Sequence, residues 1–283
     1  SMAYEFKTGE WSETICAQAG IDPAIFPEVR PAGQAIAGLR PQVASRLGLS
    51  TQVQVVMGGH DHTCGSFSVG LMEKGHATNS SGTVDNALTI ISPDEIGRAL
   101  FDLGMTCGPY ILGNARYSMG GIQGAGRAVD WFVENWLQNQ GGQDAGSDPY
   151  ARLLQAAQEA PEGSDGVIFI PHLRGSTAPH KSSIARGAFV GLKDTHNWGN
   201  MARALFEGLS MEYRLMVDGL EDALGRRLGS LTCFGGGSQN AFWARIKAAV
   251  LKRPLTICHT QENTALGAVV LAGLGSGVYR DID

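Results

Sequence analysis

The chain has 283 residues, of which 43% are hydrophobic and 17% are charged, and its formal net charge is −5. This length suits one large domain or two smaller ones, and the apolar content is enough for a substantial core rather than a disordered chain. A negative net charge argues against a nucleic-acid partner, which needs a basic surface. The longest apolar runs fall well short of the roughly 20 residues that cross a bilayer, so we expect no membrane partner.

The predicted elements of the first third of the chain are short and are separated by glycine and proline. In chain order they are helices over residues 11–20, 41–47 and 63–69, and strands over residues 54–57, 77–79 and 87–91. The first two helices are expected to end at Gly20 and Gly48, because glycine is a common stop signal.

The rest of the chain alternates between strands and helices. Two strands of an antiparallel group are expected over residues 100–105 and 110–112, and the glycine-rich residues 120–126 are expected to open a helix that includes residues 128–137. The remaining predicted elements are helices over residues 150–160, 200–224, 241–251 and 263–274, and strands over residues 167–170, 231–234 and 254–258. This alternation predicts a layered α/β fold. The helix over residues 200–224 is the longest, and we consider it a candidate interface for a homodimer.

Cysteine usage and the first residues bear on the origin of the chain. The five cysteines lie far apart and show no paired spacing: Cys16, Cys64, Cys107, Cys233 and Cys258. An odd, scattered set is typical of reduced thiols, so we expect a cytoplasmic protein. The first residues resemble a tag remnant followed by neither a helix cap nor a strand, and we expect the chain to begin inside a longer protein.

Three consecutive glycines, Gly235, Gly236 and Gly237, follow the strand predicted over residues 231–234 and precede the helix predicted over residues 241–251. Glycine lets a flat ligand lie directly against the main chain, and a strand that restarts as a helix directs free backbone N–H groups at that ligand. The glycines therefore indicate either a nucleotide pocket or a tight turn without a ligand.

Asp61 follows the strand over residues 54–57 by a few residues, which places its carboxylate at a strand end, where ligands bind in open α/β sheets. A carboxylate there can act as a general base toward a substrate hydroxyl. Two alternatives stay open: Asp61 could cap a helix, or His60 and His62 could bind a metal ion.

The short turn over residues 80–83 is rich in hydroxyl groups and contains Gly82 and Thr83. Its backbone N–H groups and hydroxyls suit phosphate oxygens, although hairpin turns often have this composition without any ligand. The chain has no Walker A pattern, so a bound phosphate would not be held by a P-loop.

Together these segments resemble the FGGY family of carbohydrate kinases, and most closely its xylulokinase-like branch. The resemblance covers essentially the whole chain and rests on four blocks: residues 55–61, residues 81–83, residues 166–191, and residues 235–243 with Glu262 and residues 265–272.

The resemblance implies an actin-like ATPase fold of two RNase H-like lobes, an α/β architecture with a mixed sheet flanked by helices. It implies that ATP and Mg²⁺ act with a sugar substrate, and it assigns no residue of this chain as a metal ligand. Asp61 would take the proton of the attacking sugar hydroxyl, Gly82 and Thr83 would hold phosphate oxygens, and the adenosine pocket would be lined by Gly235, Gly236, Gly237, Ser238 and Asn240. Residues 1–73 would be the tail of the N-terminal lobe and residues 74–283 the C-terminal, nucleotide-binding lobe.

The sequence departs from the family pattern in three places. The family's N-terminal Asp-x-Gly-Thr motif is absent, Val84 stands where the second phosphate loop commonly has Ser, and residues 175–179 lack the charged pair of the Gly-Glu-Arg-x-Pro loop. We expect ATP-dependent phosphorylation of a sugar or polyol hydroxyl, such as that of a ketopentose, with little activity from this chain alone. The alternative is a non-catalytic actin-like module that binds a nucleotide or assembles.

Overall fold

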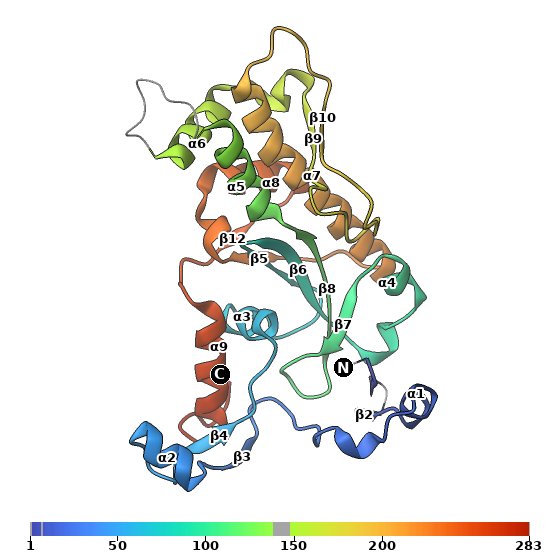
Figure 1. Ribbon diagram of the computed structural model, residues 1–283, viewed down its shortest axis with the longest axis vertical. Helices are drawn as coiled ribbons and strands as arrows, with labels where there is room; N and C mark the ends of the chain where they lie inside the picture. Colours follow the sequence, from blue (N-terminus) through green and yellow to red (C-terminus); the bar gives the residue numbers. More distant parts are fainter. Residues whose placement is uncertain (1, 7, 138–147, 283) are drawn as a thin grey trace.

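The computed structural model describes residues 2–6, 8–137 and 148–282. Its centre is a mixed six-stranded sheet in the order β12-β11-β5-β6-β8-β7 (Figure 1). These strands are β5 (Ala77–Ser81), β6 (Val84–Ile91), β7 (Thr106–Pro109), β8 (Arg116–Gln123), β11 (Leu231–Phe234) and β12 (Thr256–Ile257). β11 pairs in parallel with both β5 and β12, whereas β5, β6, β8 and β7 pair antiparallel in that order, with β8 between β6 and the edge strand β7.

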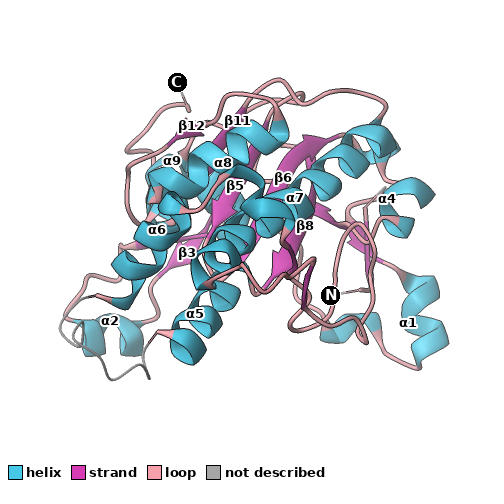
Figure 2. Ribbon diagram, turned by 90° about the horizontal axis from the view of Figure 1, so that it is seen from above, coloured by secondary structure: helices cyan, strands magenta, loops and turns pink. Residues whose placement is uncertain are grey.

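Helices cover both faces of this sheet, and smaller strand pairs lie outside it (Figures 1 and 2). The helices are α1 (Glu13–Ala19), α2 (Pro41–Leu47), α3 (Asp61–Ser68), α4 (Arg98–Asp102), α5 (Ala125–Trp136), α6 (Pro149–Glu159), α7 (Trp198–Leu224), α8 (Ala241–Leu251) and α9 (Asn263–Gly275), with short 3-10 turns η1 (Pro23–Ile25), η2 (Pro93–Glu95), η3 (Glu162–Gly166) and η4 (Gly236–Gln239). The paired outer strands are β1 (Tyr4–Glu5) with β2 (Glu10–Trp11), β3 (Ala35–Gly38) with β4 (Gln54–Val56), and β9 (Ile168–Ile170) with β10 (Ala188–Val190).

The two faces of the sheet are buried by alternate residues of the same strands. On β6, Ala87 and Ile91 belong to the large core that packs against α5, α7 and α8, whereas Leu88 and Ile90 belong to a smaller cluster on the opposite face. Because strand side chains alternate between faces, this one run of apolar residues serves both layers. The expected layered α/β architecture is confirmed.

Helix α7 contributes many of the side chains of the large core. It begins with Asn197 and Asn200 capping each other's backbone N–H groups and ends at Gly225, which has a left-handed φ of +63°. Its apolar face, including Phe206 and Tyr213, is fully buried in the core. That face therefore packs inside this chain, and the homodimer expected through this helix stays a prediction.

Several predicted elements match the structure, including the helix Pro41–Leu47, the strand Leu231–Phe234 and the helix Ala241–Leu251. The strand predicted over residues 100–105 is wrong, because a short amphipathic helix, α4, buries Leu100 there instead. The strand predicted over residues 110–112 is also wrong, since these residues lie in the loop between β7 and β8.

The glycine-rich residues 120–126 were predicted to open a helix, and this is wrong for residues 120–123 but correct from Ala125 on. They begin with the end of β8, where a Cβ at Gly120 would lie 2.6 Å from the Met105 sulfur and a Cβ at Gly121 would lie 2.9 Å from a Val84 methyl. The glycines therefore permit close packing within a strand, and the helix begins only after Gly124, whose φ is +82°.

Among the described residues, no helix is long and apolar enough to cross a membrane. The division expected after residue 73 falls in the connection between α3 and β5, and it stays a prediction.

Candidate active site

The triple glycine and the short hairpin lie side by side because their strands are parallel neighbours. Phe234, the last residue of β11, is opposite Ser80 near the end of β5, so the segments that follow the two strands leave the sheet at the same edge. Gly235 follows with φ +90° and ψ 169°, a conformation essentially restricted to glycine. A Cβ at Gly235 would lie 2.6 Å from the Ser81 carbonyl oxygen, and a Cβ at Gly237 would lie 2.6 Å from Ser81 Oγ. The glycine loop, residues 235–237, therefore packs directly on the hairpin.

The hairpin turn between β5 and β6 consists of Gly82 and Thr83, both of which are exposed. The Gly82 N–H donates to the Val84 carbonyl at 3.1 Å. On the other side, a Cβ at Gly126 would lie 2.6 Å from the Gly82 carbonyl oxygen, so the turn also packs closely against the start of α5. The turn is thus held between two glycine-mediated contacts while its outer surface faces solvent.

A pocket of about 430 Å³ opens beside the glycine loop, within the range of small-molecule sites. Gly235 and Gly236 form one wall with Ser80, and residues 259–264 form the other. Gln239 joins the two walls, because its amide donates to the Cys258 carbonyl at 2.8 Å.

Ser238 and Asn240 have local structural roles beside this pocket. The buried Ser238 hydroxyl donates to the Gly235 carbonyl at 2.7 Å, and the Asn240 side chain caps α8 by accepting the Trp243 N–H at 3.1 Å. Gly237, Ser238 and Asn240 do not line this pocket, and neither do Gly82 and Thr83, although the hairpin contacts the glycine loop. Their assignment to nucleotide binding stays a prediction.

Sequence reasoning missed most of the second wall. Only Glu262 was singled out there, and its backbone adopts an uncommon left-handed conformation with φ +56° immediately before α9. His259, Thr260 and Gln261 carry no motif signal, and only the return of the chain past β12 places them opposite the glycines.

Asp61 is the first residue of α3, and its carboxylate is 66% exposed. Its Oδ1 accepts the His62 backbone N–H at 2.7 Å and lies 2.9 Å from His60 Nδ1. The cap position itself belongs to His60, whose Nδ1 also accepts the His62 N–H at 3.3 Å. Asp61 therefore supports the helix start from within the first turn and not as the predicted cap, while its carboxylate stays accessible to a ligand.

The start of α3 is attached to both the pocket and the hairpin. The Thr264 hydroxyl, which lines the pocket, donates to the Asp61 carbonyl at 3.3 Å, and the His62 ring accepts the Asn86 amide on β6 at 2.8 Å. Helices α3 and α9 are in close contact, since a Cβ at Gly267 would lie 2.1 Å from the Cys64 carbonyl oxygen. The structure therefore places the Asp61 segment beside the pocket and the hairpin.

The two histidines beside Asp61, His60 and His62, bear on the charge of this edge and on whether it can bind a metal ion. Burial lowers the pKa of His62, against a smaller opposing effect of Asp61, so the neutral ring is the form that accepts the Asn86 amide proton. Within the described ranges, no group of three or more histidine, cysteine or acidic residues is arranged to hold a metal ion. The alternative of a metal site built on His60 and His62 has no further ligand there.

Comparison with known proteins agrees with this geometry. The C-terminal domain model of the FGGY family of carbohydrate kinases matches residues 77–276, and the N-terminal domain model matches residues 1–68. The chain is 28% identical over 274 residues to the xylulose kinase of Bacillus subtilis (strain 168), covering 97% of this chain and 52% of the relative. It is 30% identical over 282 residues to the glycerol kinase of Listeria monocytogenes serotype 4b (strain F2365), covering 99% and 54%.

The fold is shared with a solved relative. The ligand-bound xylulose kinase from Lactobacillus acidophilus superposes with a TM-score of 0.85 at 23% identity, over 99% of this chain and 55% of that protein. The expected actin-like fold is therefore confirmed, and the chain spans about half the length of the curated relatives it matches. With family matches over both of its parts, the chain belongs to the FGGY family of carbohydrate kinases.

Proposed function

We propose that this chain is the nucleotide-binding part of a kinase that transfers the γ-phosphoryl group of ATP to a hydroxyl of a sugar or polyol. One observation carries the proposal: an accessible carboxylate, Asp61, an exposed Gly-Thr hairpin and a glycine-walled pocket lie at one edge of the sheet. Phosphoryl transfer needs these three parts, namely a base, a phosphate cradle and a nucleotide pocket. The xylulose kinases among the relatives favour a ketopentose as the substrate.

In this proposal the adenosine lies against Gly235 and Gly236, where no Cβ holds it away from the backbone. Gly237, Ser238 and Asn240 complete the adenosine site, the last two by fixing the shape of the loop and the start of α8. The phosphates reach the hairpin, whose exposed Gly82 and Thr83 offer N–H groups and a hydroxyl to phosphate oxygens.

The Asp61 carboxylate receives the proton of the substrate hydroxyl as its oxygen attacks the γ-phosphorus. A positioned base of this kind is worth about 10²–10⁴ in rate. Mg²⁺ fits this scheme as an ion bound mainly by the nucleotide phosphates, because Mg²⁺ commonly keeps its waters and uses few protein ligands. Its role when bound is to neutralise charge on the transferred group.

The location and assembly of the protein are also proposals. The five free cysteines support a reducing, cytoplasmic location, since disulfides are rare there. We keep the division into residues 1–73 and 74–283, and the homodimer, as proposals to be tested by limited proteolysis and by sedimentation. We expect little sugar phosphorylation from this chain alone, because its relatives are about twice as long.

The decisive test is Asp61→Asn in a protein that joins this chain to the remaining length of its relatives. ADP release is measured by a coupled assay with D-xylulose, gluconate and glycerol, and ATP binding is measured by calorimetry. We expect turnover to fall by about 10²–10⁴ while ATP affinity changes little. Retained turnover would remove Asp61 as the base, and nucleotide binding without any sugar effect in the parent protein would favour the non-catalytic module.

A further inference from the structure

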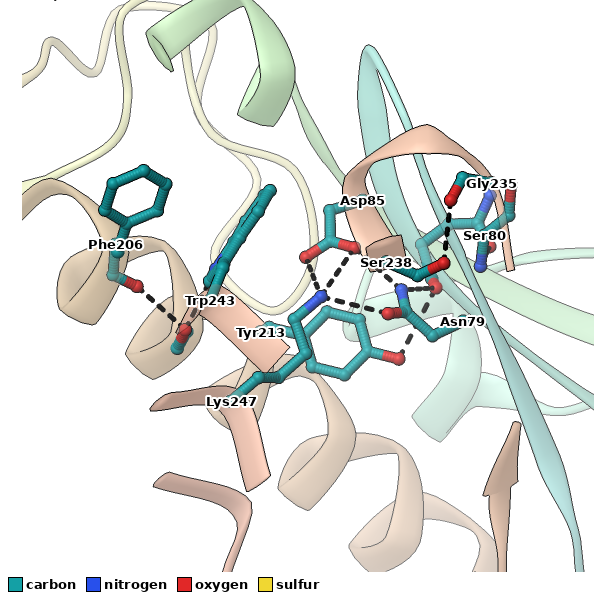
Figure 3. Close-up of polar contacts among 11 residues, drawn as sticks. Asn79, Ser80, Asp85, Phe206, Tyr213, Gly235, Ser238, Trp243 and Lys247 are labelled. Atoms are coloured by element: carbon teal, nitrogen blue, oxygen red, sulfur yellow. Dashed lines mark hydrogen bonds and ion pairs between the residues drawn. The ribbon is translucent and has the colours of Figure 1, made fainter. Parts of the chain in front are cut away.

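A buried lysine lies directly beneath the glycine loop (Figure 3). Lys247 Nζ is 2.8 Å from Asp85 Oδ2, 3.0 Å from Asp85 Oδ1 and 2.9 Å from Asn79 Oδ1. Lys247 is 4% exposed, and Asp85 and Asn79 are 0% exposed. These three side chains come from α8, β6 and β5, so one ammonium group joins the helix to both strands of the hairpin.

Protein groups surround this ammonium group, and its neighbours are hydrogen-bonded to one another. Its Nζ lies 4.8 Å from the ring centroids of both Tyr213 and Trp243, a distance at which cation–π attraction operates. The Asn79 amide donates to Asp85 Oδ1 at 2.7 Å and to the Asn86 carbonyl at 2.8 Å. Lys247 is thus enclosed by protein groups and does not reach into the nucleotide pocket.

Stability alone is a weak reason for such a pair. Removing two charges from water costs several kcal/mol per ion, and apolar side chains often replace a buried pair without loss of stability. Position suggests another role, because Asn79 lies three residues before Gly82 and Asp85 lies three residues after it. Lys247 lies on the helix that the glycine loop leads into.

The contact between hairpin and glycine loop leaves little room for adjustment. A Cβ at Gly235 or Gly237 would lie 2.6 Å from atoms of Ser81, and in the described part of the chain the buried Ser81 hydroxyl has no hydrogen-bond partner. Backbone surfaces in direct contact transmit a shift of α8 to the hairpin, since packed interiors have few voids to absorb it.

We propose that Lys247 and Asp85 are positioning residues that set the spacing between the phosphate hairpin and the glycine loop, so that one nucleotide engages both. The inference rests on the proposed nucleotide site. It concerns how one nucleotide binds to the hairpin and the glycine loop together, and not whether either of them binds a ligand alone. It predicts that disturbing the pair weakens ligands that touch both elements and spares ligands that touch only one.

Adenosine and ADP separate these two cases, because adenosine occupies only the glycine-loop side whereas ADP also reaches the hairpin. Binding of each to the 283-residue chain is measured by titration calorimetry at fixed salt. In Lys247→Met we expect ADP affinity to fall at least about tenfold while adenosine affinity stays within about twofold, since small misplacements of binding groups have large effects. A purely structural role would lower thermal stability and leave the ADP-to-adenosine affinity ratio unchanged.

Lys247→Met leaves the buried Asp85 carboxylate without its positively charged partner, which can prevent folding, so a second variant is needed. Lys247→Met/Asp85→Asn removes both charges; we expect it to recover thermal stability but to keep the lowered affinity ratio. The matched control is Arg253→Met, which removes an ion pair between the half-buried Arg253 and the buried Glu221, away from the pocket, and should leave the ratio unchanged.

The outcomes distinguish the two proposals. A parent chain that binds adenosine and ADP, together with a double variant of unchanged affinity ratio, overturns the positioning role alone. The positioning role is also overturned if both Lys247 variants fail to fold, because the pair then serves the fold. A parent chain that binds neither ligand overturns the proposed nucleotide site together with this inference.

Discussion

Replacing Gly235 with alanine is expected to destabilise the protein, whereas the same change at Gly236 is not. Gly235 has φ +90° and ψ 169°, and a Cβ there would lie 2.6 Å from the Ser81 carbonyl oxygen and 3.3 Å from its carbon. These are backbone atoms of a central strand, so they cannot rotate away. At Gly236 nothing lies within 4 Å of the added Cβ, and φ is outside the left-handed region.

The magnitude follows from the backbone strain and the contact. Holding a residue with a side chain in this glycine-only region costs about 1–3 kcal/mol, and displacing the Ser81 backbone adds to that. We expect Gly235→Ala to lower the free energy of unfolding by at least about 2 kcal/mol, a change of roughly 30-fold in the folding equilibrium. Gly236→Ala should stay within about 0.5 kcal/mol of the parent.

Urea unfolding followed by tryptophan fluorescence measures both variants, and ADP titration measures the pocket. Gly236 lines the pocket, so its alanine variant should fold normally and still bind ADP more weakly. Equal stability of the two alanine variants would refute the claim that the glycine loop packs on the hairpin through Gly235. Unchanged ADP affinity in Gly236→Ala would refute the placement of the nucleotide against this glycine.

Three further predictions concern charge and thiol chemistry. Burial lowers the pKa of His62 in the folded state below its ordinary value of 6.5, so the unfolded state binds more protons between these two pKa values. The free energy of unfolding should therefore be highest above about pH 6.5 and should fall as the pH drops through the folded pKa. The urea midpoint should follow this fall, and it should change less with pH in His62→Gln. Burial raises the pKa of Cys233 to about 12. Burial also opposes ionisation of Cys258, but hydrogen bonds from Thr260 and Asn263 outweigh this effect and lower the pKa of Cys258. A thiol reagent at about pH 8 should therefore label Cys258 well before Cys233. The reverse order of labelling in peptide mapping would contradict this prediction. Finally, Lys247→Met should cost about 3–5 kcal/mol in urea unfolding by stranding buried Asp85, and Lys247→Met/Asp85→Asn should recover most of it; an equally unstable double variant would contradict the pairing.

Local signals predicted well those parts of the chain where a single strong pattern operates. Gly20 ends helix α1 and Gly48 ends helix α2, and these glycines were the signals that set the predicted ends of both helices. The errors came where one pattern had two structural uses. Gly120 and Gly121 indicated a helix start, but they serve a strand that passes close to Met105 and Val84. A contact between distant segments leaves no trace in the local pattern, so it could not be predicted.

By itself, the sequence determined the family, the layered α/β architecture and the candidate parts of the site: Asp61, the Gly-Thr hairpin and the triple glycine. These depend on short motifs whose chemistry is carried by adjacent residues. Only the tertiary structure decided which distant residues meet, such as the second pocket wall over residues 259–264 and the enclosure of Lys247 by Asp85. The physical reason is that strand order and helix packing set these contacts, and both arise from burial across the whole chain rather than from any local run of residues.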